Sequence, residues 1–225
     1  MNRTHLVMFS DDRYILYIYH FCLIRIKINN KIYDIYMANV STYKSRNKLR
    51  FDDNCRYKQS QFIPQNYEKV IGDPRILCRS SWELKVADWC DRNSQVLKWG
   101  SEIVPISYRD PSAINISEAA KYNLDVTNPI NWPIKNYYPD MYIEMDDGNG
   151  GIKKFLIEIK PYDQTQPPKP VPENAKLKDM KNFNNAAKTF LQNDAKWKAA
   201  REWCKLHDIE FVIFTEHQLE RMGLL

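Results

Sequence analysis

The chain contains few of the residues that build disulfide or zinc scaffolds. Its 225 residues include only five cysteines and four histidines. No two cysteines have C-x-x-C spacing, and the histidines do not cluster with them. These absences disfavour a disulfide scaffold and a structural zinc site, so we expect reduced cytosolic thiols. The 6 glycines and 12 prolines follow no fixed period, which excludes collagen-like chains and most repeat architectures.

The chain also lacks a convincing membrane or secretion segment. The apolar run at residues 14–24 is well below the ~20 residues that span a bilayer. Acidic residues precede it and no small-residue cleavage site follows, so it makes a poor signal peptide. We interpret residues 1–36 as an upstream extension, with Met37 as a natural alternative start. An intact Met1 in the mass spectrum of the natively expressed protein would contradict this interpretation.

Neither sign of charge is in large excess, but the charges are unevenly distributed. The net charge is +5. Residues 80–168 hold 9 basic and 13 acidic residues, whereas residues 44–79 and 169–205 each hold 9 basic and 4 acidic residues. An acidic middle between basic flanks suits a metal-dependent enzyme that acts on a phosphate polymer. The alternative is ordinary variation of solvated surface charge.

The length and the apolar share of 44% predict one folded domain with extensions. We divide the chain into an N-terminal extension at residues 1–44, a basic arm at residues 45–78 and a folded domain at residues 79–225. We expect little regular structure in the arm, which has a turn at Gly72-Asp73-Pro74. It either lies on a nucleic-acid backbone or acts as a solubilising tail.

The folded domain begins with a strong helix signal over residues 80–93. Ser80 is a good N-cap, and Glu83 three residues later completes a capping box. Apolar residues at helical spacing form one face, namely Trp82, Val86, Trp89 and Cys90. Glu83 therefore either caps this helix, or pairs with Arg79, or contributes a carboxylate to a site. A strand is predicted at Glu102–Tyr108, followed by an insertion at residues 110–136 that carries structure of its own.

Two strands separated by a glycine-rich turn carry the chemistry. The first begins after a proline at Tyr137-Tyr-Pro-Asp140, and the second, at residues 154–160, ends at Pro161. Side chains alternate along a strand, so Glu158 and Lys160 share one face. In an antiparallel hairpin, Asp140 near the start of one strand lies beside Glu158 near the end of the other. Two carboxylates and an ammonium group therefore converge at one end of a sheet.

That set of groups is suited to phosphodiester hydrolysis. Carboxylates at Asp140 and Glu158 are hard oxygen ligands for Mg²⁺, with Mn²⁺ as a substitute. The metal lowers the pKa of a bound water and offsets charge on the phosphate oxygens. Lys160 either positions that water or helps to deprotonate it, and Glu83 supplies a further ligand, directly or through water. The alternative is that Glu-x-Lys at a strand end is ordinary surface.

The C-terminal third predicts a long basic helix, a strand and a short helix, at residues 177–207, 209–214 and 216–222. A proline-rich connector at residues 167–172 precedes the long helix. Phe183, Ala187, Phe190, Trp197 and Cys204 mark its apolar face. Its lysines either contact DNA phosphates or form a solvated face. The candidates for DNA contact are Lys176, Lys178, Lys181, Lys188, Lys196 and Lys198.

In this order, helical Glu83, Pro139-Asp140 and Glu158-Ile-Lys160 resemble the PD-(D/E)xK nuclease superfamily. Further strings look like the head completion nucleases of T-even-type bacteriophages, relatives of the TnsA-type transposon endonucleases. These strings are Arg79-Ser-Ser-Trp-Glu-Leu, Trp99-Gly-Ser-Glu102, Tyr138-Pro-Asp140 and Leu156-Ile-Glu-Ile-Lys-Pro161, then Gln164-Thr-Gln-Pro-Pro168. The resemblance covers about residue 58 to the C-terminus.

The resemblance implies a restriction-endonuclease-like α/β core in which helices flank a mixed central sheet. It implies a Mg²⁺-dependent deoxyribonuclease domain at residues 79–225, with Glu83, Asp140, Glu158 and Lys160 catalytic. Arg79 and Gln164 are expected to support them. The expected partners are double-stranded DNA and phage head or neck proteins, without a membrane or a small-molecule cofactor. The expected location is the host cytoplasm during head completion and head–tail joining, or the virion itself.

Two other functions compete with this reading. One is a structural capsid-neck protein in which cleavage is incidental, and the other is a TnsA-like endonuclease subunit in transposition. The intact set of Asp140, Glu158 and Lys160 favours the enzyme, because a purely structural protein would tolerate its loss. Since no base-reading motif is present, we expect DNA contact mainly through the backbone.

Overall fold

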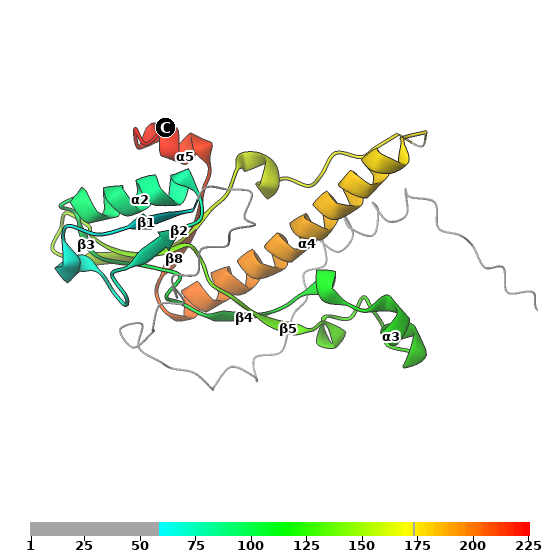
Figure 1. Ribbon diagram of the computed structural model, residues 1–225. Helices are drawn as coiled ribbons and strands as arrows, with labels where there is room; N and C mark the ends of the chain where they lie inside the picture. Colours follow the sequence, from blue (N-terminus) through cyan, green and yellow to red (C-terminus); the bar gives the residue numbers. More distant parts are fainter. Residues whose placement is uncertain (1–58, 173) are drawn as a thin grey trace, which may run out of the picture.

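The computed structural model describes residues 59–172 and 174–225. The predictions for residues 1–36 and for the first part of the basic arm lie outside this range. A mixed four-stranded sheet forms the centre, in the order β3–β6–β7–β8 (Figure 1). Its strands are β3 (Val96–Ser101), β6 (Met141–Asp146), β7 (Ile152–Ile159) and β8 (Glu210–Phe214). The first three are antiparallel neighbours, whereas β7 and β8 are parallel.

Helices cover both faces of this sheet, as expected for a restriction-endonuclease-like core. α2 (Ser81–Arg92) and α5 (Glu216–Arg221) lie on one side, and α4 (Leu177–Leu206) packs on the other (Figure 1). Alternation along the strands divides the core accordingly. Met141, Ile143 and Ile157 face α2, whereas Tyr142 and Leu156 pack with α4. The sheet is therefore buried on both faces.

The helices follow the predicted apolar patterns closely. α2 begins after Ser80, whose side chain accepts a hydrogen bond from the backbone of Glu83. Val86 and Cys90 are buried on its inner face. In α4 the predicted apolar face is confirmed at Ala187, Trp197 and Cys204, which are all buried. Both helices are thus held by tertiary packing of one apolar face.

The predicted strand at Glu102–Tyr108 is wrong in its bounds. The chain instead completes β3 at Ser101, turns, and resumes as β4 (Ile106–Arg109). Glu102 has a φ of +49°, in the left-handed region that few side chains adopt, and this turns the chain out of the sheet. β4 then pairs with β5 (Ile134–Tyr137) in a separate antiparallel ribbon. Periodicity alone did not reveal the break, because apolar residues continue through the turn.

The insertion carries local structure, as predicted, and the basic arm differs from expectation. Between β4 and β5 lie η3 (Pro111–Ala113), α3 (Ile116–Lys121) and η4 (Pro129–Asn131). The described part of the arm is ordered: β1 (Ser60–Phe62) pairs with β2 (Ile76–Cys78), and η2 (Tyr67–Lys69) lies between them. β2 is buried against α2, so this part of the arm belongs to the core.

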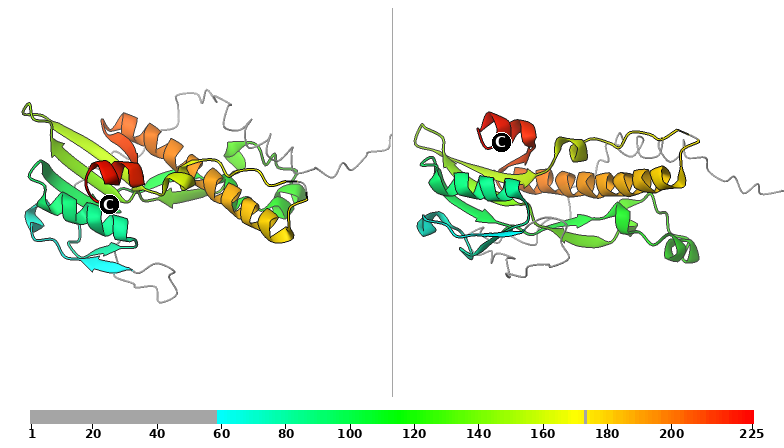
Figure 2. Two further views of the ribbon diagram at one scale, coloured as in Figure 1. Left: turned by 90° about the horizontal axis from the view of Figure 1, so that it is seen from above. Right: turned by 45° about the horizontal axis from the view of Figure 1, so that its top comes forward.

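α4 extends well beyond the sheet, and the β4–β5 ribbon runs alongside it (Figures 1 and 2). Gln192 of α4 donates a hydrogen bond to Asp110, at the end of β4, over 2.8 Å. η5 (Tyr162–Thr165) and the connector lead from β7 to α4. Within residues 59–172 and 174–225, no helix combines the length and apolar character that a bilayer-crossing segment needs.

Candidate active site

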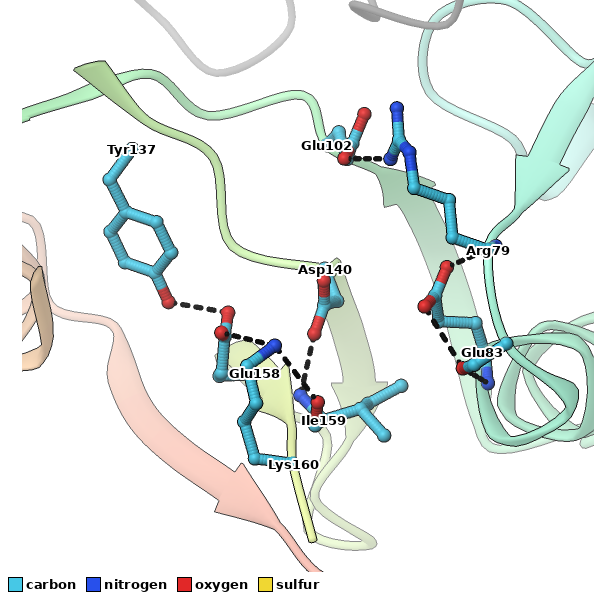
Figure 3. Close-up of polar contacts among 9 residues, drawn as sticks. Arg79, Glu83, Glu102, Tyr137, Asp140, Glu158, Ile159 and Lys160 are labelled. Atoms are coloured by element: carbon cyan, nitrogen blue, oxygen red, sulfur yellow. Dashed lines mark hydrogen bonds and ion pairs between the residues drawn. The ribbon is translucent and has the colours of Figure 1, made fainter. Parts of the chain in front are cut away.

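The β6–β7 hairpin brings Asp140 and Glu158 together. Met141 pairs with Ile157, so the next residues outward along the two strands are Asp140 and Glu158. Asp140 Oδ2 accepts a hydrogen bond from the backbone N–H of Ile159 over 2.7 Å. This bond fixes the first carboxylate against the end of β7 (Figure 3). The convergence predicted from strand alternation is therefore present, although β6 itself begins one residue after Asp140.

Glu158 is buried and held from two sides. Its Oε2 accepts a hydrogen bond from the hydroxyl of Tyr137 over 2.6 Å, and its Oε1 lies 2.9 Å from Lys160 Nζ. The Glu158 side chain is 4% exposed and that of Lys160 is 27% exposed. The backbone N–H of Lys160 donates to Phe214, which continues the pairing of β7 with β8. Lys160 thus reaches the site from a fixed backbone position.

The electrostatics of this centre are unbalanced. Burial, and then the negative charge of Glu158, raise the pKa of Asp140 well above its ordinary range. Burial lowers the pKa of Lys160, but the charges of Asp140 and Glu158 outweigh it, so the pKa of Lys160 is raised. One ammonium group therefore serves two adjacent carboxylates. A divalent cation would stabilise the ionised form of Asp140, and its oxygens are donors that Mg²⁺ accepts.

The protein supplies only part of a metal coordination shell. Across residues 59–172 and 174–225, no three His, Cys, Asp or Glu side chains are grouped closely enough to hold a metal ion. The adjacent donors are the carboxylates of Asp140 and Glu158. Such a two-carboxylate set suits Mg²⁺, which keeps several waters and takes the remaining oxygens from substrate phosphates. The residues present fit a magnesium ion shared with substrate.

Glu83 lies across from this pair, at the start of α2 (Figure 3). Its Oε2 accepts a hydrogen bond from the backbone of Arg79 over 2.7 Å, and its Oε1 accepts from the hydroxyl of Ser80 over 2.9 Å. Ser80 therefore caps α2 as predicted, but the reciprocal bond of a capping box is replaced, because the Glu83 carboxylate accepts from the backbone of Arg79 and not from that of Ser80. Burial raises the pKa of Glu83, and its charge raises the pKa of Asp140. Glu83 holds the start of α2 and also adds negative charge to the site.

The guanidinium of Arg79 pairs with Glu102 and not with Glu83. Arg79 Nη1 forms an ion pair with Glu102 Oε1. The backbone N–H of Glu102 donates to the carbonyl of Asp140 over 3.2 Å. The positive φ of Glu102 therefore places its side chain beside the site, where it holds Arg79 at the rim (Figure 3). Glu102 was not predicted as a site residue, although its Trp99-Gly-Ser-Glu102 string was noticed.

Tyr137 is the second residue that the sequence did not single out. Its ring is buried and its hydroxyl donates to Glu158. Burial and the charge of Glu158 raise the pKa of Tyr137 well above its ordinary range, so the hydroxyl keeps its proton. A hydrogen bond of this kind holds the Glu158 carboxylate in one orientation. The only sequence signal was its position just before the Tyr138-Pro-Asp140 string.

The other predicted residues fall into two groups. Gln164 is exposed in η5, and within the described ranges no side-chain hydrogen bond joins it to the two carboxylates. The predicted DNA-contacting lysines all lie on α4 or at its N-terminus. Five of them are exposed, and Lys196 is half-buried. The exposed five are Lys176, Lys178, Lys181, Lys188 and Lys198.

Two comparisons with known proteins accompany this geometry. A family model described as TnsA-like endonuclease N terminal matches residues 93–216, a range that includes Asp140, Glu158 and Lys160 but not Glu83. The head completion nuclease of Enterobacteria phage T4 is 34% identical over 165 residues, which cover 72% of this chain and 94% of that protein. The family match extends from β3 through α4 and β8, and so includes the whole central sheet.

Proposed function

This chain belongs to the family of TnsA-like endonucleases and is a deoxyribonuclease, and we propose that it hydrolyses DNA phosphodiester bonds with Mg²⁺ held by Asp140 and Glu158. The observation that carries this proposal is the unbalanced carboxylate pair. Asp140 is fixed by Ile159, Glu158 is fixed by Tyr137 and Lys160, and among the described residues Lys160 alone forms an ion pair with either acid. The raised pKa of Asp140 means that ionising both acids is costly unless a cation binds there.

The side chains divide the chemistry between them. When bound, Mg²⁺ lowers the pKa of a coordinated water and offsets charge on the phosphate oxygens. Asp140 and Glu158 would hold it with oxygens that their hydrogen bonds have already oriented. Lys160 remains an ammonium ion, because both carboxylates raise its pKa. It therefore donates a hydrogen bond that orients the attacking water or a phosphate oxygen, in preference to accepting a proton.

Arg79 and Glu83 lie across from Asp140 and Glu158 (Figure 3). Glu83 uses its carboxylate to hold the start of α2, so it reaches a metal through water more readily than directly. Glu102 holds Arg79 at the rim through one guanidinium nitrogen, and Arg79 carries further donors in a fixed fork. That fork matches the oxygens of a phosphate. We assign Arg79 to the approach of the DNA backbone.

The biological setting that we propose is completion of phage heads. The relative in Enterobacteria phage T4 is named for head completion, and the match covers 94% of that relative. The partners would then be packaged double-stranded DNA and head or neck proteins, with cleavage in the host cytoplasm or on the particle. A purely structural neck protein would have no need for the strained pair of Asp140 and Glu158.

Cleavage of duplex DNA with Mg²⁺ or Mn²⁺, or with a chelator, tests the enzyme. We expect ion-dependent cleavage by the wild type and its loss in Glu158→Gln and Lys160→Ala. Glu144→Gln is the matched control, because Glu144 on β6 also accepts a tyrosine hydroxyl, that of Tyr142 over 2.8 Å. Activity that persists in Glu158→Gln would refute the assigned site. Cleavage only with a partner protein present would favour the transposition-type subunit.

A test of the setting needs the infected cell. Inactivating the gene should leave DNA-filled heads without tails, and a plasmid copy of the wild type should restore complete virions. A plasmid copy of Glu158→Gln separates the two roles. Restoration by this variant would show that head completion needs the protein but not its cleavage.

A further inference from the structure

Lys196 differs from the other basic residues of α4. It is half-buried, whereas the remaining candidate lysines of this helix are exposed. Its Nζ lies 5.7 Å from the centre of the Tyr137 ring, and the hydroxyl of that ring holds Glu158. Lys198, two residues further on, points to solvent and pairs with Asp194 over 2.6 Å. One lysine of α4 is thus directed toward the carboxylate centre.

The packing of α4 fixes this direction. Trp197, Ala200 and Cys204 are buried against the sheet in the same cluster as Tyr137 and Leu156. On the other side of Lys196, Asn193 is buried and Gln192 is bonded to Asp110. A rotation that carried Lys196 to the surface would expose this buried face. The helix therefore holds the ammonium group near the site.

The ammonium group of Lys196 has no carboxylate partner to neutralise it. Within residues 59–172 and 174–225, none of its nitrogen–carboxylate distances falls in ion-pair range. Burial lowers the pKa of Lys196, and the positive charge of Lys160 lowers it further, while the charges of Glu158, Asp110 and Asp140 only partly oppose this. A partly desolvated ammonium group with no direct ion pair can bind a phosphate, because part of the cost of removing water is already met.

We propose that Lys196 contacts a phosphate of the DNA backbone next to the bond that is cleaved. The proposal rests on the proposed nuclease function and specifies how α4 takes part in it. Lys160 and Arg79 approach the substrate from β7 and from the start of α2, and Lys196 approaches from α4. The exposed lysines of α4 contribute weaker, long-range attraction, which salt screens. Lys196 is thus a substrate-binding residue of the site, whereas Lys198 is not.

Paired variants distinguish these two lysines. Lys196→Met removes the charge and keeps the apolar stem, Lys196→Arg restores a cation, and Lys198→Met is the matched control. The measurements are kcat and KM for a duplex oligonucleotide with Mg²⁺, and binding of that duplex in chelator over a range of salt. We expect Lys196→Met to lower kcat/KM by about 10-fold or more. We also expect the slope of log binding constant against log salt to fall by about 0.9, one phosphate contact. Lys196→Arg should recover most of the lost kcat/KM and most of the lost salt slope.

Thermal unfolding separates binding from a structural role. If Lys196 only packs on Tyr137, Lys196→Met will lower the melting temperature, and its salt slope will match that of Lys198→Met. Those two results would overturn the proposal. An unchanged or higher melting temperature with a reduced slope supports it. Wild-type protein that fails to cleave DNA with Mg²⁺ would instead refute the nuclease function, and the salt slope in chelator would still report on Lys196.

Discussion

Two buried carboxylate centres of this protein use similar side chains and reach opposite electrostatic states. Asp110, at the end of β4, has a fully buried side chain that accepts hydrogen bonds from Ser112, Lys135 and Gln192. Burial raises its pKa, but those hydrogen bonds outweigh it and lower the pKa of Asp110 to about 2. At Asp140, burial and the charge of Glu158 outweigh the effects that lower the pKa, so the pKa of Asp140 is raised.

The difference shows that a buried acid with a nearby lysine is not in itself a reactive centre. Asp110 joins the β4–β5 ribbon to α4, and its donors come from three elements, so its charge is fully compensated. Asp140 has one backbone donor and shares its lysine with a second acid. The first arrangement stabilises the ionised acid, whereas the second disfavours it, as the raised pKa of Asp140 shows.

Asp140→Asn is the substitution that tests the difference between Asp140 and Asp110 most strongly. Removing a carboxylate from the proposed metal site should lower the rate of Mg²⁺-dependent cleavage by at least about 100-fold. The free energy of unfolding in chelator should stay equal or rise, because the charge repulsion with Glu158 is gone. Cleavage assays and urea denaturation measure the two effects. A variant that unfolds more easily would show that Asp140 serves the fold.

Asp110→Ala should give the reverse pattern. We expect the free energy of unfolding to fall by about 1–2 kcal/mol, because half-buried donors from Ser112 and Gln192 lose their acceptor. Lys135 adds little to this loss, since its side chain is 46% exposed and returns to water. Cleavage per folded molecule should change only a few-fold. Urea denaturation and cleavage well below the melting temperature test both parts.

Lowering the pH should change the stability contributions of Asp110 and Asp140 in opposite directions. The pKa of Asp110 is depressed from 3.8 to about 2, so its stabilisation is complete above pH 3.8 and is lost as the pH falls through 2. The gap between wild type and Asp110→Ala should thus shrink by about 1–2 kcal/mol over that window. The pKa of Asp140 is raised, so any gain in Asp140→Asn should shrink as acid protonates the wild-type carboxyl. Urea denaturation at several pH values in chelator measures both gaps.

Tyr137→Phe tests whether Glu158 depends on its buried donor. Loss of the hydroxyl should lower kcat/KM by about 10-fold, the effect of removing a hydrogen bond that orients a metal ligand. Tyr142→Phe is the control, because Tyr142 donates to Glu144 within the same sheet. Equal losses in the two variants would indicate general loosening of the core and not a specific effect on Glu158.

The smallest effect is stabilisation by the metal itself. With Mg²⁺ at about ten times its dissociation constant, wild-type protein should gain about 1.4 kcal/mol against unfolding. Asp140→Asn and Glu158→Gln should gain almost nothing, whereas Asp110→Ala should gain as much as the wild type. Thermal shifts with and without Mg²⁺ measure this. A shift that survives in Asp140→Asn would place the metal elsewhere.

Much of the site was predictable because its key residues are close in sequence. Glu158 and Lys160 share a strand face, and a short glycine-rich turn returns the chain so that Asp140 meets them. The Ser80–Glu83 cap followed from the spacing of the helix start. Each of these features depends on local backbone geometry, because the periodicity of a helix or strand fixes which side chains share a face.

Contacts between residues far apart in the chain could not be predicted from the sequence. Tyr137 reaches Glu158 across 21 residues and Arg79 reaches Glu102 across 23, and no local period relates these positions. The left-handed backbone at Glu102 delays the strand predicted from that residue, which begins only at Ile106. The sequence offered Glu83 as one possible partner of Arg79, whereas its guanidinium pairs with Glu102, because ion pairs depend on which distant segments pack together.

By itself, the sequence determined the order of helices and strands, the family resemblance, and the meeting of Asp140, Glu158 and Lys160. Only the tertiary structure decided that Asp110 is compensated while Asp140 is not, and that Lys196 alone among the candidate lysines of α4 turns inward. The physical reason is that periodicity is a property of the backbone within one element. Desolvation and charge balance depend on every group that several elements bring together.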